Sequence, residues 1–246
     1  PDLRYHPGGP PIPPYDVTAQ TLGMLMGVDV DQIDEPVRAD LELLEEIAPR
    51  RATMPPRPAW GYLVGPGSNA GFLAAARLQR EGVPLYRAGD RFESEGRAYA
   101  PGTWLVPPTA EAAAILEALS RETGLLVRGA NTAPDVSGFR LRTPTRVGLW
   151  RGANNMPGGW MRWLFEQYEL GHVEVSSLDF GGDLSDKYDV IVLPAGTTRR
   201  RIVQGLDERR HDDTWRWAYG VGDQGWNTLA AWVRDGGTLV ALGSAV

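Results

Sequence analysis

Short apolar runs that alternate with helical patterns constrain the fold of this chain more than any other feature. The runs lie over 146–150, 173–177, 188–193 and 238–242, and the helical patterns lie over 158–168, 199–205 and 223–234. Strand runs this apolar, when helices separate them, are typical of a parallel sheet that helices cover on both faces. The sequence therefore predicts an α/β domain over 144–246.

Two of these predicted helices carry an apolar stripe at helical spacing. On the 158–168 helix, the residues that we expect to face the core are Trp160, Met161, Leu164 and Tyr168. On the 223–234 helix, the corresponding residues are Trp226, Leu229, Ala230 and Val233.

Residues 59–143 predict a second, smaller α/β domain. The predicted elements are strands over 60–64, 83–87, 92–99, 103–106 and 124–127 and helices over 68–81 and 109–123. The 92–99 and 103–106 strands are expected to be antiparallel, with Pro101 and Gly102 between them. Thr109 can cap the helix that follows it. Residues 128–143 are polar and irregular in pattern, which indicates a domain boundary.

Residues 1–58 predict a proline-rich linker with two helices. The run His6-Pro7-Gly8-Gly9-Pro10-Pro11-Ile12-Pro13-Pro14 cannot form a helix or a central strand. Short helices are expected over 18–26 and 37–47.

Composition excludes several classes of protein. The chain has 246 residues, a net charge of −6 and no cysteine. The acidic balance argues against general nucleic-acid binding, and the lack of cysteine excludes disulfides, thiolate zinc sites and cysteine catalysis. No apolar run approaches the roughly 18–20 residues of a membrane span. Because the chain begins at Pro1, we expect a processed protein or an excised part of a longer one.

A glycine-rich turn is the strongest indication of a nucleotide site. Gly65, Gly67 and Gly71 follow a predicted strand and open a helix, and Asp90 lies after the next strand. However, Pro66 removes one N–H that could face a phosphate. We favour the competing interpretation, in which the glycines form an ordinary turn and Asp90 lies at the surface.

The segment 199–222 is a long excursion that could carry a ligand. Trp215, Trp217 and Tyr219 could form a platform for a carbohydrate or a partner protein, although core packing under a long loop is the competing interpretation. The basic runs 199–201 and 209–210 alternate with acidic residues, which is typical of a salt-bridged surface.

The remaining candidates for chemistry are weak. His6, His172 and His211 form no metal-binding motif, and zinc catalysis usually needs three protein ligands, so we expect no metal site in this chain. The acidic residues Asp179, Asp183, Asp186 and Asp189 fit no calcium loop and are expected in solvated loops. Ser244 follows the last predicted strand at an elbow-like position, but no histidine follows it and the sequence is not G-x-S-x-G.

Several segments, taken in their order along the chain, resemble a known family. They are GGPPIPPYDVTAQTL at 8–22 continued by MGV at 26–28, YAPGTWLVP at 99–107, RVGLW at 146–150, GWMRWL at 159–164, YDVIVLP at 188–194 and GGTLVALG at 236–243. This order is similar to the region that follows the catalytic domain in large bacterial zinc carboxypeptidases of the carboxypeptidase A-like metallopeptidases. The resemblance implies that 144–246 is a flavodoxin-like, class I glutamine amidotransferase-like domain, whose sheet would normally continue past Val246.

The resemblance also implies where the chemistry lies. Zinc, its H-x-x-E pair and the glutamate base would belong to a catalytic domain upstream of Pro1, and this chain would be a non-catalytic accessory region. Working amidotransferases carry a cysteine after the strand that corresponds to 238–242, and here Gly243 and Ser244 stand in that place. No catalytic residue of either family therefore transfers to a position of this chain. The longer protein would act on peptides and be secreted or periplasmic.

Three alternatives remain open. The first is a nucleotide- or carbohydrate-binding module that uses the glycine-rich turn or the 199–222 segment. The second is a partner-docking domain with an amidotransferase-like fold. The third is a hydrolase with an amidotransferase-like fold that acts through Ser244.

Overall fold

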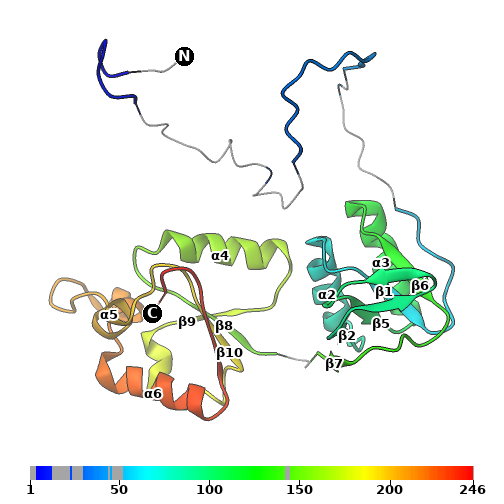
Figure 1. Cartoon of the computed structure of the whole chain (residues 1–246). Coiled ribbons are helices and arrows are strands. Elements are labelled where there is room, and N and C mark those ends of the chain that lie inside the picture. Colours follow the sequence, from blue (N-terminus) through cyan, green and yellow to red (C-terminus); the bar gives the residue numbers. More distant parts are fainter. Residues whose placement is uncertain are drawn as a thin grey trace. The chain divides into compact units, whose positions relative to one another are not determined.

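The computed structural model describes residues 4–12, 23, 30–43, 45, 52–141 and 145–245. They divide into two units, Pro1–Ile47 and Ala48–Val246. The second unit carries the candidate site, and Figure 1 labels many of its helices and strands.

The described residues of the first unit form little regular structure. Arg4 and Pro11 form an antiparallel bridge. Residues 37–43 are not helical, so the predicted helix over 37–47 is wrong for these residues. Leu41 and Leu43 are 84% and 88% exposed, so these two side chains contribute no packing that would stabilise a helix, and short isolated helices are marginal in water. The predicted helix over 18–26 lies outside the described residues, apart from Gly23.

The first sheet of the second unit is antiparallel, with the order β6-β1-β5-β2-β7. Its strands are β1 (Gly61–Val64), β2 (Tyr86–Ala88), β5 (Trp104–Val106), β6 (Val127–Ala130) and β7 (Gly138–Arg140). The helices α2 (Ala70–Arg80) and α3 (Ala110–Thr123) pack against each other, and their buried residues share one core with Tyr62 and Val64. Leu63, which alternates with them along β1, lies in a separate cluster with Leu105. Both faces of β1 are therefore buried, although its neighbours are antiparallel.

The ends of α3 follow from two residues. Thr109 has an extended backbone, and its side chain accepts a hydrogen bond from the backbone N–H of Ala112 over 3.1 Å. Gly124 ends the helix in the left-handed conformation, with a φ of 72°. The predicted helix over 109–123 is confirmed, because a hydroxyl at the N-cap and a glycine after the last turn satisfy the free backbone groups.

Four expectations about residues 59–143 are wrong. The predicted strand over 92–99 is a hairpin, β3 (Phe92–Ser94) and β4 (Arg97–Tyr99), because Glu95 and Gly96 both take positive φ values and reverse the chain. The strand β5 pairs with β1 and β2 rather than with this segment. The last predicted strand lies at 127–130 instead of 124–127, and β7 lies within the part that was expected to be irregular.

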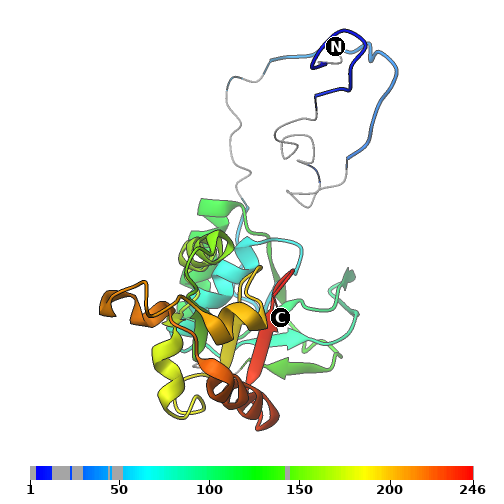
Figure 2. The same cartoon turned by 90° about the vertical axis from the view of Figure 1, so that its left-hand side faces the viewer.

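The second sheet is parallel, as the sequence predicts, with the order β11-β10-β8-β9. Its strands are β8 (Val147–Trp150), β9 (Val173–Val175), β10 (Val190–Leu193) and β11 (Thr238–Ala241). The helix α4 (Met156–Gln167) lies on one side of this sheet, and α5 (Arg199–Gln204) and α6 (Gly222–Arg234) lie on the other (Figures 1 and 2). The described residues thus form a mixed α/β structure with a four-stranded parallel sheet.

The apolar core of this part lies between the sheet and α5 and α6. Ile191 and Leu193 of β10 are fully buried there, together with Ile202 of α5 and Leu229 and Trp232 of α6. Trp232 is the buried tryptophan of α6, whereas Val233, which we expected to face the core, is 38% exposed. Gly237 lies directly beneath the indole of Trp232, which leaves no room for a side chain at that position.

The helix α4 differs most from its prediction. None of its residues is buried, and Trp160 and Leu164, which we expected to face the core, are 63% and 38% exposed. Met161 and Tyr168 are only half-buried. The apolar spacing of this helix therefore predicts its secondary structure correctly but not the direction that its aromatic residues face.

Candidate functional site

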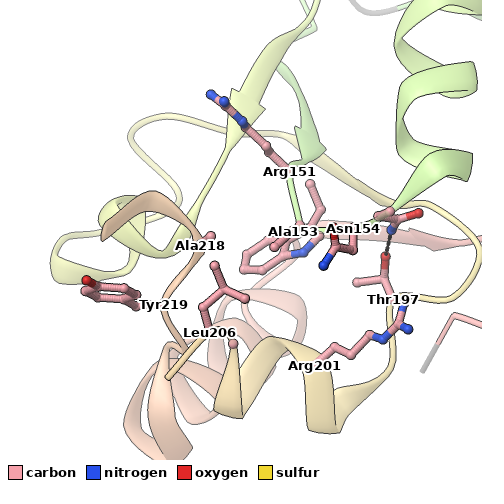
Figure 3. Close-up of a pocket in the computed structure, with 12 residues that line it drawn as sticks. Arg151, Ala153, Asn154, Thr197, Arg201, Leu206, Ala218 and Tyr219 are labelled. Carbon is pink, nitrogen blue, oxygen red and sulfur yellow. Dashed lines mark hydrogen bonds between the residues drawn. The ribbon is translucent and has the colours of Figure 1, made fainter. Parts of the chain in front are cut away.

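A crevice opens where β8 and β10 end. The chain leaves β8 for β9 on one side of it, and later returns to β10 on the other side. Ligands in open α/β sheets bind outside the carboxyl ends of the strands at such a switch point, because the two connections diverge there. A cavity of about 200 Å³ lies at this place in the structure (Figure 3).

The loop after β8 and the loop after β10 meet across the crevice. Asn155 donates from its side-chain amide to the hydroxyl of Thr197 over 2.9 Å. The amide oxygen of Asn155 also accepts from the backbone N–H of Gly158 over 3.1 Å and so caps α4. Thr197 is 1% exposed, and its backbone N–H donates to the carbonyl of Pro194. One asparagine therefore fixes the start of α4 and the spacing of the two loops.

The lining of the crevice is cationic on its polar side. Arg151 and Arg201 belong to it, together with Asn154, and no aspartate or glutamate does. The guanidinium of Arg201 donates to the carbonyl of Gly196 over 3.1 Å. Trp150, Leu206 and Ala218 supply the apolar part of the lining.

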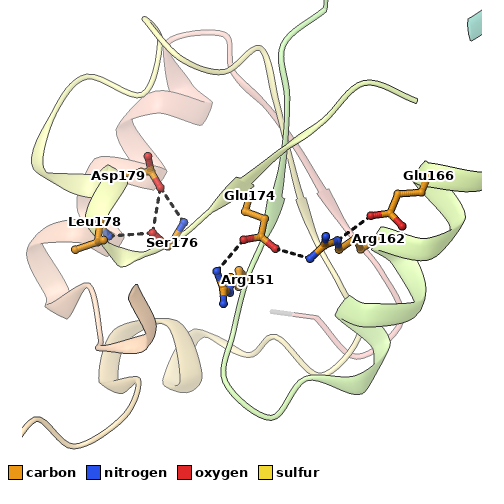
Figure 4. Close-up of polar contacts among 7 residues, drawn as sticks. All are labelled: Arg151, Arg162, Glu166, Glu174, Ser176, Leu178 and Asp179. Carbon is orange, nitrogen blue, oxygen red and sulfur yellow. Dashed lines mark hydrogen bonds and ion pairs between the residues drawn. The ribbon is translucent and has the colours of Figure 1, made fainter. Parts of the chain in front are cut away.

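Arg151 is held away from the centre of the crevice. Its guanidinium lies 3.9 Å from the ring centre of Trp217 and forms a 2.9 Å ion pair with Glu174. Glu174 also pairs with Arg162, which pairs with Glu166 in turn (Figure 4). The hydrogen bond to Glu166 is the main reason that the pKa of Arg162 is raised. The strand β9 and the helix α4 are thus linked by alternating charges beside the crevice.

A second feature is an exposed aromatic face on α4, formed by Met156, Trp160, Trp163 and Leu164. These side chains are 75%, 63%, 51% and 38% exposed. The rings of Trp160 and Trp163 meet edge to face, with their centres 5.9 Å apart. Contiguous apolar surface of this kind marks an interaction site, whereas single exposed apolar residues do not.

The glycine-rich turn lies in the antiparallel sheet, away from any parallel switch point. Gly71 is buried against the indole of Trp104, and Gly65 and Gly67 have open space around them. Asp90 is exposed and accepts a hydrogen bond from the hydroxyl of Ser137. Asp90 is thus engaged by Ser137, and of the three glycines only Gly71 packs against a side chain.

The predicted aromatic platform is only partly available. Trp215 is 43% exposed, but Trp217 lies under Arg151. The hydroxyl of Tyr219 donates to the carbonyls of His211 and Asp212, and Tyr219 also lines the crevice. The short 3₁₀ helix over Asp213–Ala218 thus contributes one wall of the crevice rather than an open stacking surface.

The acidic residues between β9 and β10 stabilise loops. Asp179 forms a capping box with Ser176 (Figure 4). Burial alone would raise the pKa of Asp179, but hydrogen bonds from Ser176, Lys187 and Tyr188 together lower it. Asp189 pairs with Arg146 over 2.8 Å. Among the described residues, no group of three or more histidine, aspartate or glutamate side chains is arranged to hold a metal ion.

Ser244 lies on the expected elbow, and no histidine of the described residues bonds to its hydroxyl. Gly243 before it has a φ of 56°, and the serine hydroxyl accepts a hydrogen bond from the backbone N–H of Gly196 over 3.1 Å. The ring nitrogens of His172 and His211 contact the carbonyls of Leu170 and Asp207 instead. Within the described part of the chain, the structure does not assemble a nucleophile with a histidine.

Comparisons of the chain with family models, with curated proteins and with solved structures find no match. In the part of the chain that the structure describes, no helix is long and apolar enough to cross a membrane.

Proposed function

We propose that this chain is a non-catalytic accessory region of a zinc carboxypeptidase-like protein and that it docks on the catalytic domain of that protein. The resemblance of its segments, in their order along the chain, supports the family. The exposed aromatic face of α4 carries the docking role, because it is the largest group of exposed apolar side chains on one helix among the described residues.

The finer fold belongs to the same proposal. Counted along the chain, the strands of the parallel sheet have the order 2-1-3-4. This is the order of the first four strands in a flavodoxin-like sheet. It supports, for residues 144–246, a flavodoxin-like fold of the class I glutamine amidotransferase type in which small residues replace the nucleophile.

The chemistry of the longer protein would reside in its catalytic domain. There, a bound zinc ion would activate water for the hydrolysis of C-terminal peptide bonds. The accessory region would hold that domain and shape access of the peptide to it. The proposal assigns no zinc ligand and no catalytic residue to this chain, and it places the longer protein outside the cytoplasm.

The α4 face suits an intramolecular contact of this kind. Tryptophan side chains dominate interface energetics because they bury a large area at little cost in conformational entropy. Arg162 and Glu166 flank the tryptophans and are exposed, which matches an apolar centre with a polar rim. Substituting both tryptophans with glutamate would remove the apolar contact and place two charges in it.

The test uses the protein expressed with the coding sequence upstream of Pro1. We expect Trp160→Glu combined with Trp163→Glu to increase amide hydrogen exchange on the catalytic domain, and to lower its temperature of inactivation. Phe139→Glu is the matched control, because Phe139 is 62% exposed but lies on β7, in the other sheet. Equal effects of the two changes, or no effect of either, would refute docking through α4.

A further inference from the structure

We infer that the crevice at the carboxyl ends of β8 and β10 binds a small organic anion through a carboxylate or phosphate group. This inference is separate from the docking role, which concerns the outer face of α4. It rests on the charge of the lining, on free backbone donors and on the size of the cavity.

Arg201 supplies the positive charge. Its guanidinium makes one hydrogen bond, to the carbonyl of Gly196, and it contacts no carboxylate among the described residues. Arginine presents five N–H donors, so most of its donors are free for a ligand. Arg151 is engaged by Glu174 and Trp217 and points away from Arg201 in Figure 3, so it contributes only at longer range.

The loop after β8 supplies further donors. In the described structure, the backbone N–H groups of Gly152, Ala153 and Asn154 donate to no protein acceptor. All three residues line the crevice, and Asn154 takes a φ of 52°. Consecutive free N–H groups around a left-handed residue form concave sites that favour anions. The hydrogen bond from Asn155 to Thr197 fixes this loop, so that the donors are held in place before a ligand arrives.

The size and the walls of the cavity limit the ligand. About 200 Å³ is less than the roughly 300–1,000 Å³ of pockets for drug-sized molecules. Buried Trp150 and Ala218, with Leu206, form an apolar wall that suits a short carbon chain. The ligand is therefore a compact anion with a small apolar part, rather than a dinucleotide or an oligosaccharide.

Calorimetric titration of the 246-residue chain tests this inference, with inorganic phosphate, succinate and L-glutamate as probes. We expect at least one probe to bind saturably at millimolar concentrations, and the one that binds distinguishes a phosphate from a carboxylate ligand. Arg201→Gln should weaken that binding about tenfold or more, because a hydrogen bond to a charged group is lost. Asn154→Asp should also weaken it, since it adds a negative charge while an aspartate tolerates the same backbone conformation.

Arg200→Gln is the matched control. Arg200 is the neighbour of Arg201 on α5, but it bonds to Gln204 and does not line the crevice. We expect it to bind the probe like the unaltered chain, and we expect the α4 variant Trp160→Glu to do the same. The inference is overturned if no probe binds, if Arg201→Gln binds as well as the unaltered chain, or if Arg200→Gln weakens binding equally. None of these results bears on docking through α4.

Discussion

The outward direction of Trp160 can be tested by comparing two tryptophan truncations. Trp160 of α4 is 63% exposed, and Trp232 of α6 is 4% exposed. A tryptophan buries up to about 250 Å² when it is fully covered, so Trp160 covers about 90 Å². At about 25 cal/mol per Å², this area contributes at most about 2 kcal/mol to the free energy of unfolding. The better helix propensity of alanine offsets about 0.5 kcal/mol of this loss in the free energy of unfolding.

The two truncations should therefore differ clearly in a thermal unfolding experiment followed by circular dichroism. For a chain of this size, 1 kcal/mol corresponds to about 2–4 °C in Tm. Trp160→Ala loses at most about 1.5 kcal/mol and should lower Tm by no more than about 6 °C. Trp232→Ala leaves a cavity in the core and loses about 3–5 kcal/mol of unfolding free energy, so it should lower Tm by about 6–20 °C, at least twice as much as Trp160→Ala.

The same experiment can refute the reasoning. If Trp160→Ala lowers Tm as much as Trp232→Ala does, the aromatic face of α4 lies in a core, as the apolar spacing of this helix alone predicts. The surface that we propose for docking would then not exist.

Three further predictions concern the start of α3, the core of the first sheet, and the ion pairs of Arg77 and Arg80 on α2 with Glu169. Thr109→Ala should lower the free energy of unfolding by about 1 kcal/mol in denaturant titrations, because the N-cap hydrogen bond to Ala112 is lost, and an unchanged value would contradict the cap. Leu116→Ala should lower the free energy of unfolding by about 2–5 kcal/mol, because Leu116 is 0% exposed, and Leu126→Ala should lower it by less than about 0.5 kcal/mol, because Leu126 is 51% exposed. Equal losses for the two variants would contradict the placement of Leu116 in the core. Hydrogen bonds from Arg77, and to a smaller extent from Arg80, lower the pKa of Glu169 in the folded protein. The stability that these bonds provide is therefore fully present above the pKa of an unfolded glutamate, about 4.3, and is lost as the pH falls through the lower pKa of folded Glu169. Glu169→Gln should therefore lower the free energy of unfolding near neutral pH and make it fall less steeply as the pH drops. If the free energy of unfolding falls with pH as steeply in the variant as in the unaltered chain, the bonds from Arg77 and Arg80 to Glu169 contribute nothing to stability.

Local signals in the sequence predict the elements whose ends depend on neighbouring residues. Thr109 and Gly124 mark the two ends of α3, and the unbroken apolar run over 190–193 marks a strand that is covered on both faces. These features depend on backbone groups and side chains that are a few residues apart, so they can be predicted from the sequence alone. The Glu95-Gly96 turn is also a local feature. A residue pair of this kind is a hairpin signal, and it predicts two short strands in place of one strand over 92–99.

Contacts between distant segments could not be predicted in this way. The strand β5 pairs with β1 and β2, and nothing in the local pattern distinguishes these partners from β4. The aromatic spacing of α4 is the same for a helix that faces a core and for one that faces a partner. The direction of Trp160 therefore depends on contacts with distant segments, which the spacing along α4 does not specify.

The sequence does not predict the crevice directly, because the residues on its two sides are far apart in the chain. Asn155 and Thr197 are 42 positions apart in sequence, and they meet only because β8 and β10 are neighbours. A usable signal was nevertheless present. Once the apolar runs over 146–150 and 188–193 are taken as parallel strands, the residues that follow them become the candidates for a site at their carboxyl ends. Arg151, Asn154, Asn155 and Thr197 all lie there, whereas the glycine-rich turn lies in the antiparallel sheet.

The accessory role is tested most directly by a carboxypeptidase assay on two proteins, the 246-residue chain and the protein expressed with the coding sequence upstream of Pro1. We predict that the longer protein contains bound zinc and releases C-terminal residues from peptides, that a chelator abolishes this activity, and that the 246-residue chain releases none. Activity in the 246-residue chain, or the lack of zinc-dependent activity in the longer protein, would contradict the account.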